Sequence, residues 1–121
     1  MYLGAVNPGM LALCGQTAQG VILTRSTVEQ ARAAIGHVSA GALGVGRDPS
    51  EVELALQLAC SVSDNKEEER DRICGRVAMY AARFPCYRGV MEEAGFTEEG
   101  KPSACAWDQG SHAQAQNLVP D

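Results

Sequence analysis

Segments with the spacing of strands alternate along this chain with segments that have the spacing of helices. Short, mainly apolar runs at residues 1–5 and 21–24 predict strands. From Val52 to Val62 the even positions are mostly large and apolar, whereas the odd positions are small or polar. This alternation predicts a third strand with one face under helices and the other towards a confined interior. Because helix signals separate the strands, the pattern predicts βα units and a parallel sheet.

Helix signals follow the first strand directly. Asn7 is suited to be the N-cap of a helix over residues 8–18. Pro8 is suited to be its first residue, because the missing N–H of proline costs nothing there. We expect Gly20 to end this helix in a left-handed conformation. These signals predict a tight turn between the first strand and its helix.

A capping box opens the second predicted helix. Ser26 and Glu29 have the spacing at which a hydroxyl and a carboxylate cap each other's backbone N–H groups. Apolar residues recur after them at helical spacing, namely Ala31, Ala34, Ile35, Val38, Ala42 and Val45. We expect this row to form the buried face of the helix. Pro49 then predicts a turn over residues 47–50, because the residue before a proline disfavours helix.

The second half of the chain is predicted to be mainly helical. Asp64 and Glu67 have capping-box spacing, and the acidic run 67–69 favours the start of a helix that reaches about residue 83. Its predicted buried side consists of Ile73, Val77, Tyr80, Ala81 and Phe84. Pro85 ends that helix, and a further helix over residues 86–94 is closed by Gly95. Weaker helix signals lie at residues 104–107 and 113–118.

Composition and charge restrict the class of protein. The chain has 121 residues, of which 45% are hydrophobic and 21% charged, as is typical of one soluble globular domain. The net charge of -5 and the scattered basic residues argue against a nucleic-acid surface. No apolar run approaches the roughly 20 residues of a membrane helix, and residues 1–5 do not resemble a secretory signal. We therefore expect neither a nucleic acid nor a membrane as partner.

The cysteines indicate the compartment. There are five of them, with no Cys-x-x-Cys pair and no histidine at ligand spacing. This pattern favours free, buried thiols in a reducing cytoplasm over a disulfide framework, and it predicts no metal site.

The order of motifs resembles that of the luciferase-like monooxygenase superfamily. Residues 1–11 and 20–23 are similar to that superfamily's strand, turn, helix and next strand, and the likeness continues at residues 40–42, 46–53 and 62–65. Residues 84–88 and 92–96 resemble the helical insertion of its deazaflavin-dependent branch, which is related to methylenetetrahydromethanopterin reductase. Departures are Asn7 where the family usually has glycine, and Gln16 and Gln19 where it usually has Glu and Asp.

The resemblance implies an α/β fold that is an incomplete (β/α)8 TIM-type barrel, with about three parallel strands and a helical insertion. A complete barrel takes roughly 250 residues, so residues 1–121 are expected to form one partial barrel domain. We expect the preceding strands and the final strand to lie outside it. It also implies an oxidoreductase or monooxygenase that uses coenzyme F-420, a deazaflavin, or alternatively FMN. A small-molecule substrate is implied, and the intact protein is compatible with a homo-oligomer.

One turn carries the candidate cofactor site. Phosphates bind well at a helix N-terminus on the carboxyl edge of a parallel sheet, and small residues let the backbone approach them. The resemblance implies that this turn holds the cofactor's phosphate, through Gly4, Ala5, Val6, Asn7, Pro8, Gly9 and Met10. The competing interpretation is that Asn7 and Pro8 only cap the helix.

Other polar residues are less informative. Arg25 follows a strand and is either an anion contact or a solvated loop residue, and Gln57 and Ser61 are expected to make hydrogen bonds in the interior. His37 and His112 are expected at the surface. No catalytic residue is predicted within the chain, and the isolated chain is expected to be inactive. The alternative function is a small non-catalytic α/β module that binds a phosphorylated ligand or a partner.

Overall fold

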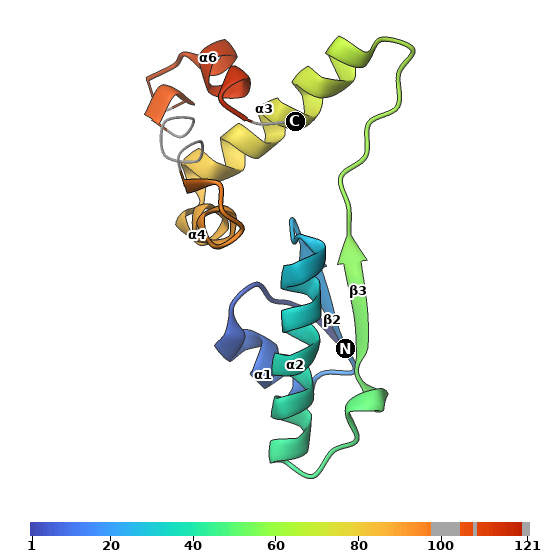
Figure 1. Ribbon diagram of the computed structural model, residues 1–121. Helices are drawn as coiled ribbons and strands as arrows, with labels where there is room; N and C mark the ends of the chain where they lie inside the picture. The colour runs from blue at the N-terminus through green and yellow to red at the C-terminus, as the bar shows by residue number, and fades with distance from the viewer. Residues whose placement is uncertain (98–104, 108, 120–121) are drawn as a thin grey trace. The chain divides into compact units, whose positions relative to one another are not determined.

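The computed structural model describes residues 1–97, 105–107 and 109–119 of the chain. The backbone forms two compact units, Met1–Leu58 and Ala59–Asp121. The first runs from blue to green in Figure 1 and contains three strands, whereas the second is helical in its described part. Each unit is built around its own apolar core.

The first unit contains a three-stranded parallel sheet in the order β1-β2-β3. Its strands are β1 (Tyr2–Gly4), β2 (Gly20–Thr24) and β3 (Glu53–Gln57). Leu3 pairs with Val21, which pairs with Leu54. The predicted parallel pairing of the three apolar segments is therefore confirmed. Parallel strands end at one edge, so the carboxyl ends of all three lie together.

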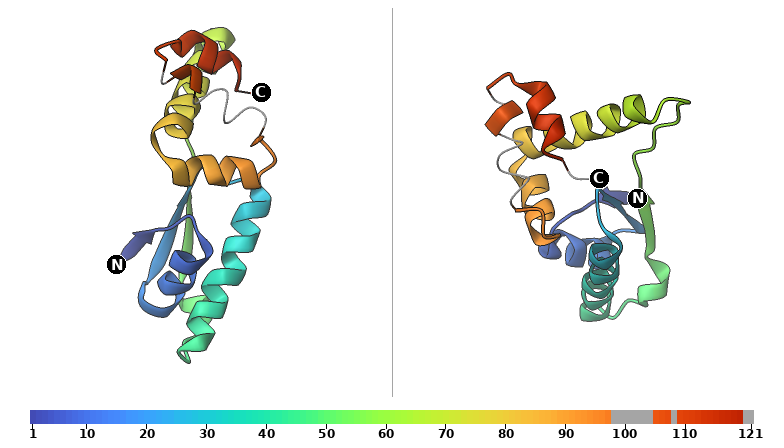
Figure 2. Two further views of the ribbon diagram at one scale, coloured as in Figure 1. Left: turned by 90° about the vertical axis from the view of Figure 1, so that its left-hand side faces the viewer. Right: turned by 45° about the horizontal axis from the view of Figure 1, so that its top comes forward.

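Two helices cover one face of this sheet, as Figure 2 shows. Helix α1 (Pro8–Thr17) and helix α2 (Val28–Gly44) bury Leu11, Val38 and other side chains against Val21 and Leu23 of β2. The helices approach so closely that a Cβ atom on Gly41 would lie 2.7 Å from the carbonyl carbon of Ala12. The short helix η1 (Pro49–Glu51) then leads into β3, where a turn was predicted.

The buried face of α2 is narrower than predicted. Ala34, Val38 and Ala42 are buried, but Ile35 and Val45 are 52% and 55% exposed. Ile35 lies about 100° around the helix from Ala34, beyond the face that α1 and the sheet cover. Val45 is the C-cap, past the last helical turn. The predicted burial of these two residues was wrong.

The third strand is shorter than predicted. It ends at Gln57, which pairs with Thr24, the last residue of β2. Arg25 has a φ of 53° and so turns the chain out of the strand conformation. Residues 58–62 therefore have no described strand beside them, although their alternating pattern resembles that of a strand.

Three predicted caps are also corrected. Thr27 and Gln30, rather than Ser26 and Glu29, form the capping box of α2. Asn65, rather than Asp64, caps α3. Gly20 does not end α1 in a left-handed conformation, because α1 already ends at Ala18 and Gly20 begins β2.

The second unit consists of α3 (Lys66–Arg83), α4 (Pro85–Glu93) and α6 (His112–Asn117) in its described part. Residues 105–107 are also helical, and Ala104, from the same predicted helix, lies outside the described residues. The core joins Cys74 and Ala78 of α3 to Ala115 of α6, with Trp107 packed against it. Pro85 separates α3 from α4, and Gly95 follows α4 with a φ of 95°, as predicted.

Two predictions of burial fail in the second unit. Phe84 is 43% exposed, because it is the residue between α3 and α4 and stacks only on Tyr80 and, edge to face, on Tyr87. All five cysteines are free, as expected, but only Cys14 and Cys74 are buried; Cys60, Cys86 and Cys105 are exposed. The core of each unit therefore contains one thiol.

Candidate functional site

The turn between β1 and α1 lies at the carboxyl edge of the sheet. β1 ends at Gly4, and the N–H of Ala5 donates to the carbonyl oxygen of Ile22 at 3.3 Å. Ala5 is buried, which anchors the start of the turn, while Asn7, Pro8 and Gly9 are exposed. The predicted residues 4–10 therefore run from the end of β1 through a short turn into the first residues of α1, at the edge where ligands bind in α/β barrels.

Several backbone N–H groups of this turn have no hydrogen-bond acceptor among the described residues. The Asn7 side chain caps α1 by accepting from the N–H of Met10 at 2.9 Å, and its carbonyl oxygen accepts from Leu11 at 3.0 Å. Pro8 has no N–H. Within the described part of the chain, the N–H groups of Val6, Asn7 and Gly9 have no hydrogen-bond acceptor. Three backbone donors in one turn suit an anion.

Charge and space around the turn also favour an anion. The first turn of α1 has no acidic residue, whereas α2 has Glu29 and α3 has three glutamates there. The positive end of the α1 dipole is thus not balanced by a side chain of its own first turn. A Cβ atom at Gly4 would meet nothing within 4 Å, and one at Gly9 would meet only Asn7 Oδ1, at 3.7 Å. A ligand group can therefore approach the backbone closely.

The polar groups at the carboxyl ends of β2 and β3 are less available to a ligand. Ser26 Oγ donates to the carbonyl oxygen of Thr24 at 3.4 Å, and Thr27 and Gln30 bond to each other at the start of α2. Arg25 is half-buried in its left-handed conformation and has an interaction within the chain. Gln57 is exposed rather than bonded in a core, so its predicted interior role is not seen. The turn after β1 is therefore more accessible than either of these two strand ends.

The remaining candidates lie elsewhere. His37 and His112 are exposed, as predicted, and His112 stacks on Trp107 with ring centroids 4.2 Å apart. Among the described residues no group of three metal-ligating side chains occurs. Burial raises the pKa of the Cys14 thiol, and hydrogen bonds from Ser50 lower the pKa of Asp48. Neither group belongs to the turn, whose open polar groups are backbone N–H donors.

Sequence reasoning missed a pocket on α3, to which Ser61 contributes. Lys66, Glu69, Arg70, Ile73, Cys74 and Val77 line it at spacings of three and four residues, the spacing of one helix face. That spacing was a usable signal for the helix wall. The opposing residue Val119 was not predictable, because it is brought there by the fold.

The sequence model of the luciferase-like monooxygenase family matches residues 1–121. This chain belongs to that family. A 5,10-methylenetetrahydromethanopterin reductase from Methanolobus tindarius is 32% identical over 101 residues, which are 84% of this chain and 30% of the relative. The corresponding reductase from Methanopyrus kandleri is 27% identical over 121 residues, which are 99% of this chain and 34% of the relative.

Solved structures agree with the sequence relatives. The coenzyme F-420 dependent tetrahydromethanopterin reductase from Methanopyrus kandleri superposes with a TM-score of 0.81 at 27% identity, over 99% of this chain and 34% of that one. This chain thus spans about a third of the length of the relatives it matches. Its α/β fold, with an unclosed parallel sheet, is a partial TIM-type barrel, as predicted. No helix among the described residues is long and apolar enough to cross a membrane.

Proposed function

We propose that residues 1–121 are part of an oxidoreductase that transfers hydride between coenzyme F-420 and a small-molecule substrate. The observation that carries the proposal is the open, uncharged first turn of α1 at the carboxyl edge of a parallel sheet, in a chain of this family. The cofactor's phosphate would be held there by Gly4, Ala5, Val6, Asn7, Pro8, Gly9 and Met10.

The chain's own contribution is binding and orientation. The deazaflavin supplies the hydride chemistry when it is bound. The N–H groups of Val6, Asn7 and Gly9 are directed to an anion, and the Asn7 amide nitrogen is a further donor because its oxygen is held by Met10. Rigid backbone donors need no reorganisation on binding, which favours a fixed position for the phosphate.

The relatives favour F-420 over FMN. The similar solved structure is that of a coenzyme F-420 dependent enzyme, and both curated relatives are methylenetetrahydromethanopterin reductases. FMN remains the alternative cofactor, because a phosphate suits the turn in either case. A titration of the protein with each cofactor distinguishes them.

We also propose how this part of the chain is organised as a domain. Residues 1–121 are proposed to be one partial barrel domain, which the family match over both units supports. A cytoplasmic location and a homo-oligomeric intact protein stay predictions. A small non-catalytic phosphate-binding module is less well supported, because the match is to enzymes and extends over nearly the whole chain.

Gly9→Asp tests the proposed site. The new carboxylate has room beside Asn7 and suits a helix N-terminus, so the fold should persist, but it would occupy the anion position and repel phosphate. In the natural polypeptide that contains residues 1–121, we expect F-420 affinity to fall by about a hundredfold or more, equivalent to roughly 3 kcal/mol. Fluorescence titration of the deazaflavin measures it.

Gly9→Ala is the matched control, because a methyl group fits at this position without adding charge. It should change the affinity by less than about threefold. If Gly9→Asp bound F-420 as tightly as the unaltered protein, the turn would not be the phosphate site.

A further inference from the structure

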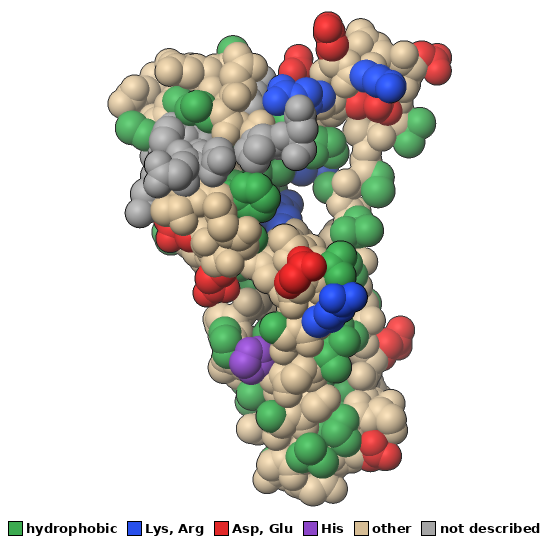
Figure 3. All heavy atoms as spheres, viewed as in Figure 1, with side chains coloured by type: hydrophobic (Ala, Val, Ile, Leu, Met, Phe, Trp, Pro, Cys, Tyr) green, Lys and Arg blue, Asp and Glu red, His purple; other side chains and the backbone are tan. Residues whose placement is uncertain are grey.

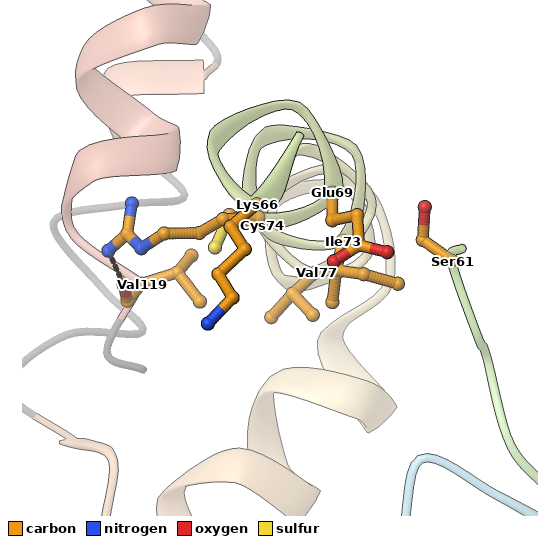
Figure 4. A pocket seen from close by; sticks show the side chains of 8 residues that line it. Ser61, Lys66, Glu69, Ile73, Cys74, Val77 and Val119 are labelled. Atoms are coloured by element: carbon orange, nitrogen blue, oxygen red, sulfur yellow. Dashed lines mark hydrogen bonds between the residues drawn. The ribbon is translucent and has the colours of Figure 1, made fainter. Parts of the chain in front are cut away.

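A pocket with a volume of about 530 Å³ opens on the side of α3, within the second unit. Figure 4 shows its lining: α3 supplies one wall, and Val119, which follows α6, faces it. This volume falls within the roughly 300–1,000 Å³ of small-molecule sites. None of residues 4–10 lines it, so the pocket shares no residue with the proposed phosphate turn.

The pocket is apolar at its base. Ile73, Cys74, Val77 and Val119 line it, and Cys74 and Val119 are buried in the core of the unit. Apolar surface open to solvent is unfavourable at roughly 25 cal/mol per Å². An apolar body that covers this base would therefore be bound by the hydrophobic effect.

The charged side chains at the rim of the pocket differ in whether they have a partner within the protein. Glu69 accepts a hydrogen bond from the N–H of Ser63 at 2.6 Å, and Arg70 donates to the carbonyl oxygen of Val119 at 3.4 Å. Lys66 makes no hydrogen bond or ion pair with any described residue. It is also the first residue of α3, where a cation is unfavourable for the helix dipole. Helix stability therefore does not explain this lysine.

We propose that the α3 pocket binds a small amphipathic molecule with an apolar body and one anionic group, such as a carboxylate. The body lies against Ile73, Val77 and Val119, and the anionic group pairs with the ammonium group of Lys66. The carboxylate of Glu69 disfavours a second anionic group beside the first. This arrangement of apolar lining and a single convergent charge is the common one in ligand pockets.

The test compares three ligands of equal chain length, used below the concentrations at which they form micelles: decanoate, decanol and decyltrimethylammonium. They are titrated into the natural polypeptide that contains residues 1–121. The Lys66 variants described next locate the site, because this side chain lines the pocket. We expect decanoate to bind saturably and to bind tightest of the three.

Lys66→Gln should weaken decanoate binding about tenfold and leave decanol binding unchanged. Lys66→Arg should retain most of the affinity for decanoate. The matched control is Arg72→Gln on the same helix, since Arg72 pairs with Glu68 and does not line the pocket. It should bind decanoate as the unaltered protein does.

Several results would overturn the inference. They are no saturable decanoate binding, equal binding of decyltrimethylammonium, or no effect of Lys66→Gln. Decanoate binding that weakens as the protein concentration rises would assign the pocket to a protein contact instead. Because residues 4–10 do not line this pocket, each of these results leaves the F-420 proposal standing. Equally, unchanged F-420 binding in Gly9→Asp would end the F-420 proposal and leave this one standing.

Discussion

At the residue scale, Tyr2 and Glu53 are joined by a hydrogen bond between the first residues of the two outer strands, β1 and β3. The tyrosine ring crosses Gly20, the first residue of β2, where a Cβ atom would collide with it. Residue 20 must therefore be a glycine because the Tyr2 ring lies over it. Its role is to make room within the sheet and not to end α1 as a left-handed cap. Residues at the amino edge of a barrel serve stability rather than catalysis.

The pH dependence of Tyr2 tests this contact. The hydrogen bond to Glu53 raises the pKa of Tyr2, and desolvation and the negative charge of Glu53 raise it further. Since the pKa is raised in the folded state, the contact stabilises fully below the ordinary tyrosine pKa of about 10 and is lost as pH rises through the raised value. The difference in 295 nm absorbance titration between the unaltered protein and Tyr2→Phe gives the pKa of Tyr2.

Glu53→Ala is the informative variant for that titration. It removes both the hydrogen-bond acceptor and the negative charge of Glu53, so the pKa of Tyr2 should move back towards the ordinary value. An identical titration in Glu53→Ala would show that the contact does not set the pKa.

At the scale of elements, the packing of α1 on α2 depends on two glycines. A Cβ atom on Gly15 would lie 2.8 Å from the Ala42 nitrogen, and one on Gly41 would clash with the backbone of Ala12. Backbone cannot move aside as a flexible side chain can. The closeness of the two helices therefore follows from the absence of side chains at residues 15 and 41.

Gly41→Ala should lower the free energy of unfolding by about 1–3 kcal/mol, the usual cost of overpacking. The control is Gly36→Ala on the same helix, where a Cβ atom meets nothing within 4 Å. This change should stabilise by about 0.5–1 kcal/mol, because glycine is a poor helix former. Urea unfolding of both variants gives the comparison, and equal effects would mean that the helices do not pack as described.

The elements also show what the sequence could and could not predict. Periodicity found the strands and helices, and the local chemistry of Asn7 and Pro8 placed the start of α1 and hence the candidate site. The start of α2 was misplaced by one residue, because Arg25 turns the chain so that Ser26 bonds back to Thr24 and Thr27 takes the cap. Where β3 ends depends on its partner strand, and a pattern within one segment cannot show that.

At the scale of the whole molecule, the parallel sheet is open at both sides. β2 lies between the outer strands β1 and β3, so each outer strand has one edge without a described partner. Hydrophobic side chains remain at the surface, as Figure 3 shows, and Leu56 and Leu58 near the β3 edge are 42% and 65% exposed. Unpaired edges next to apolar side chains favour association with another strand. In the family's longer members, further chain is available to pair with such edges.

We therefore expect a polypeptide of residues 1–121 alone to self-associate and to have no oxidoreductase activity. Sedimentation velocity over a range of concentrations measures the association. Leu56→Lys with Leu58→Lys should reduce it, because charge on an edge strand opposes pairing. Val62→Lys is the control: Val62 is 91% exposed but lies outside β3, so added charge there should matter less. A monomeric polypeptide with a cooperative thermal transition would contradict this expectation, since it would mean that the open edges are stable in water without a partner.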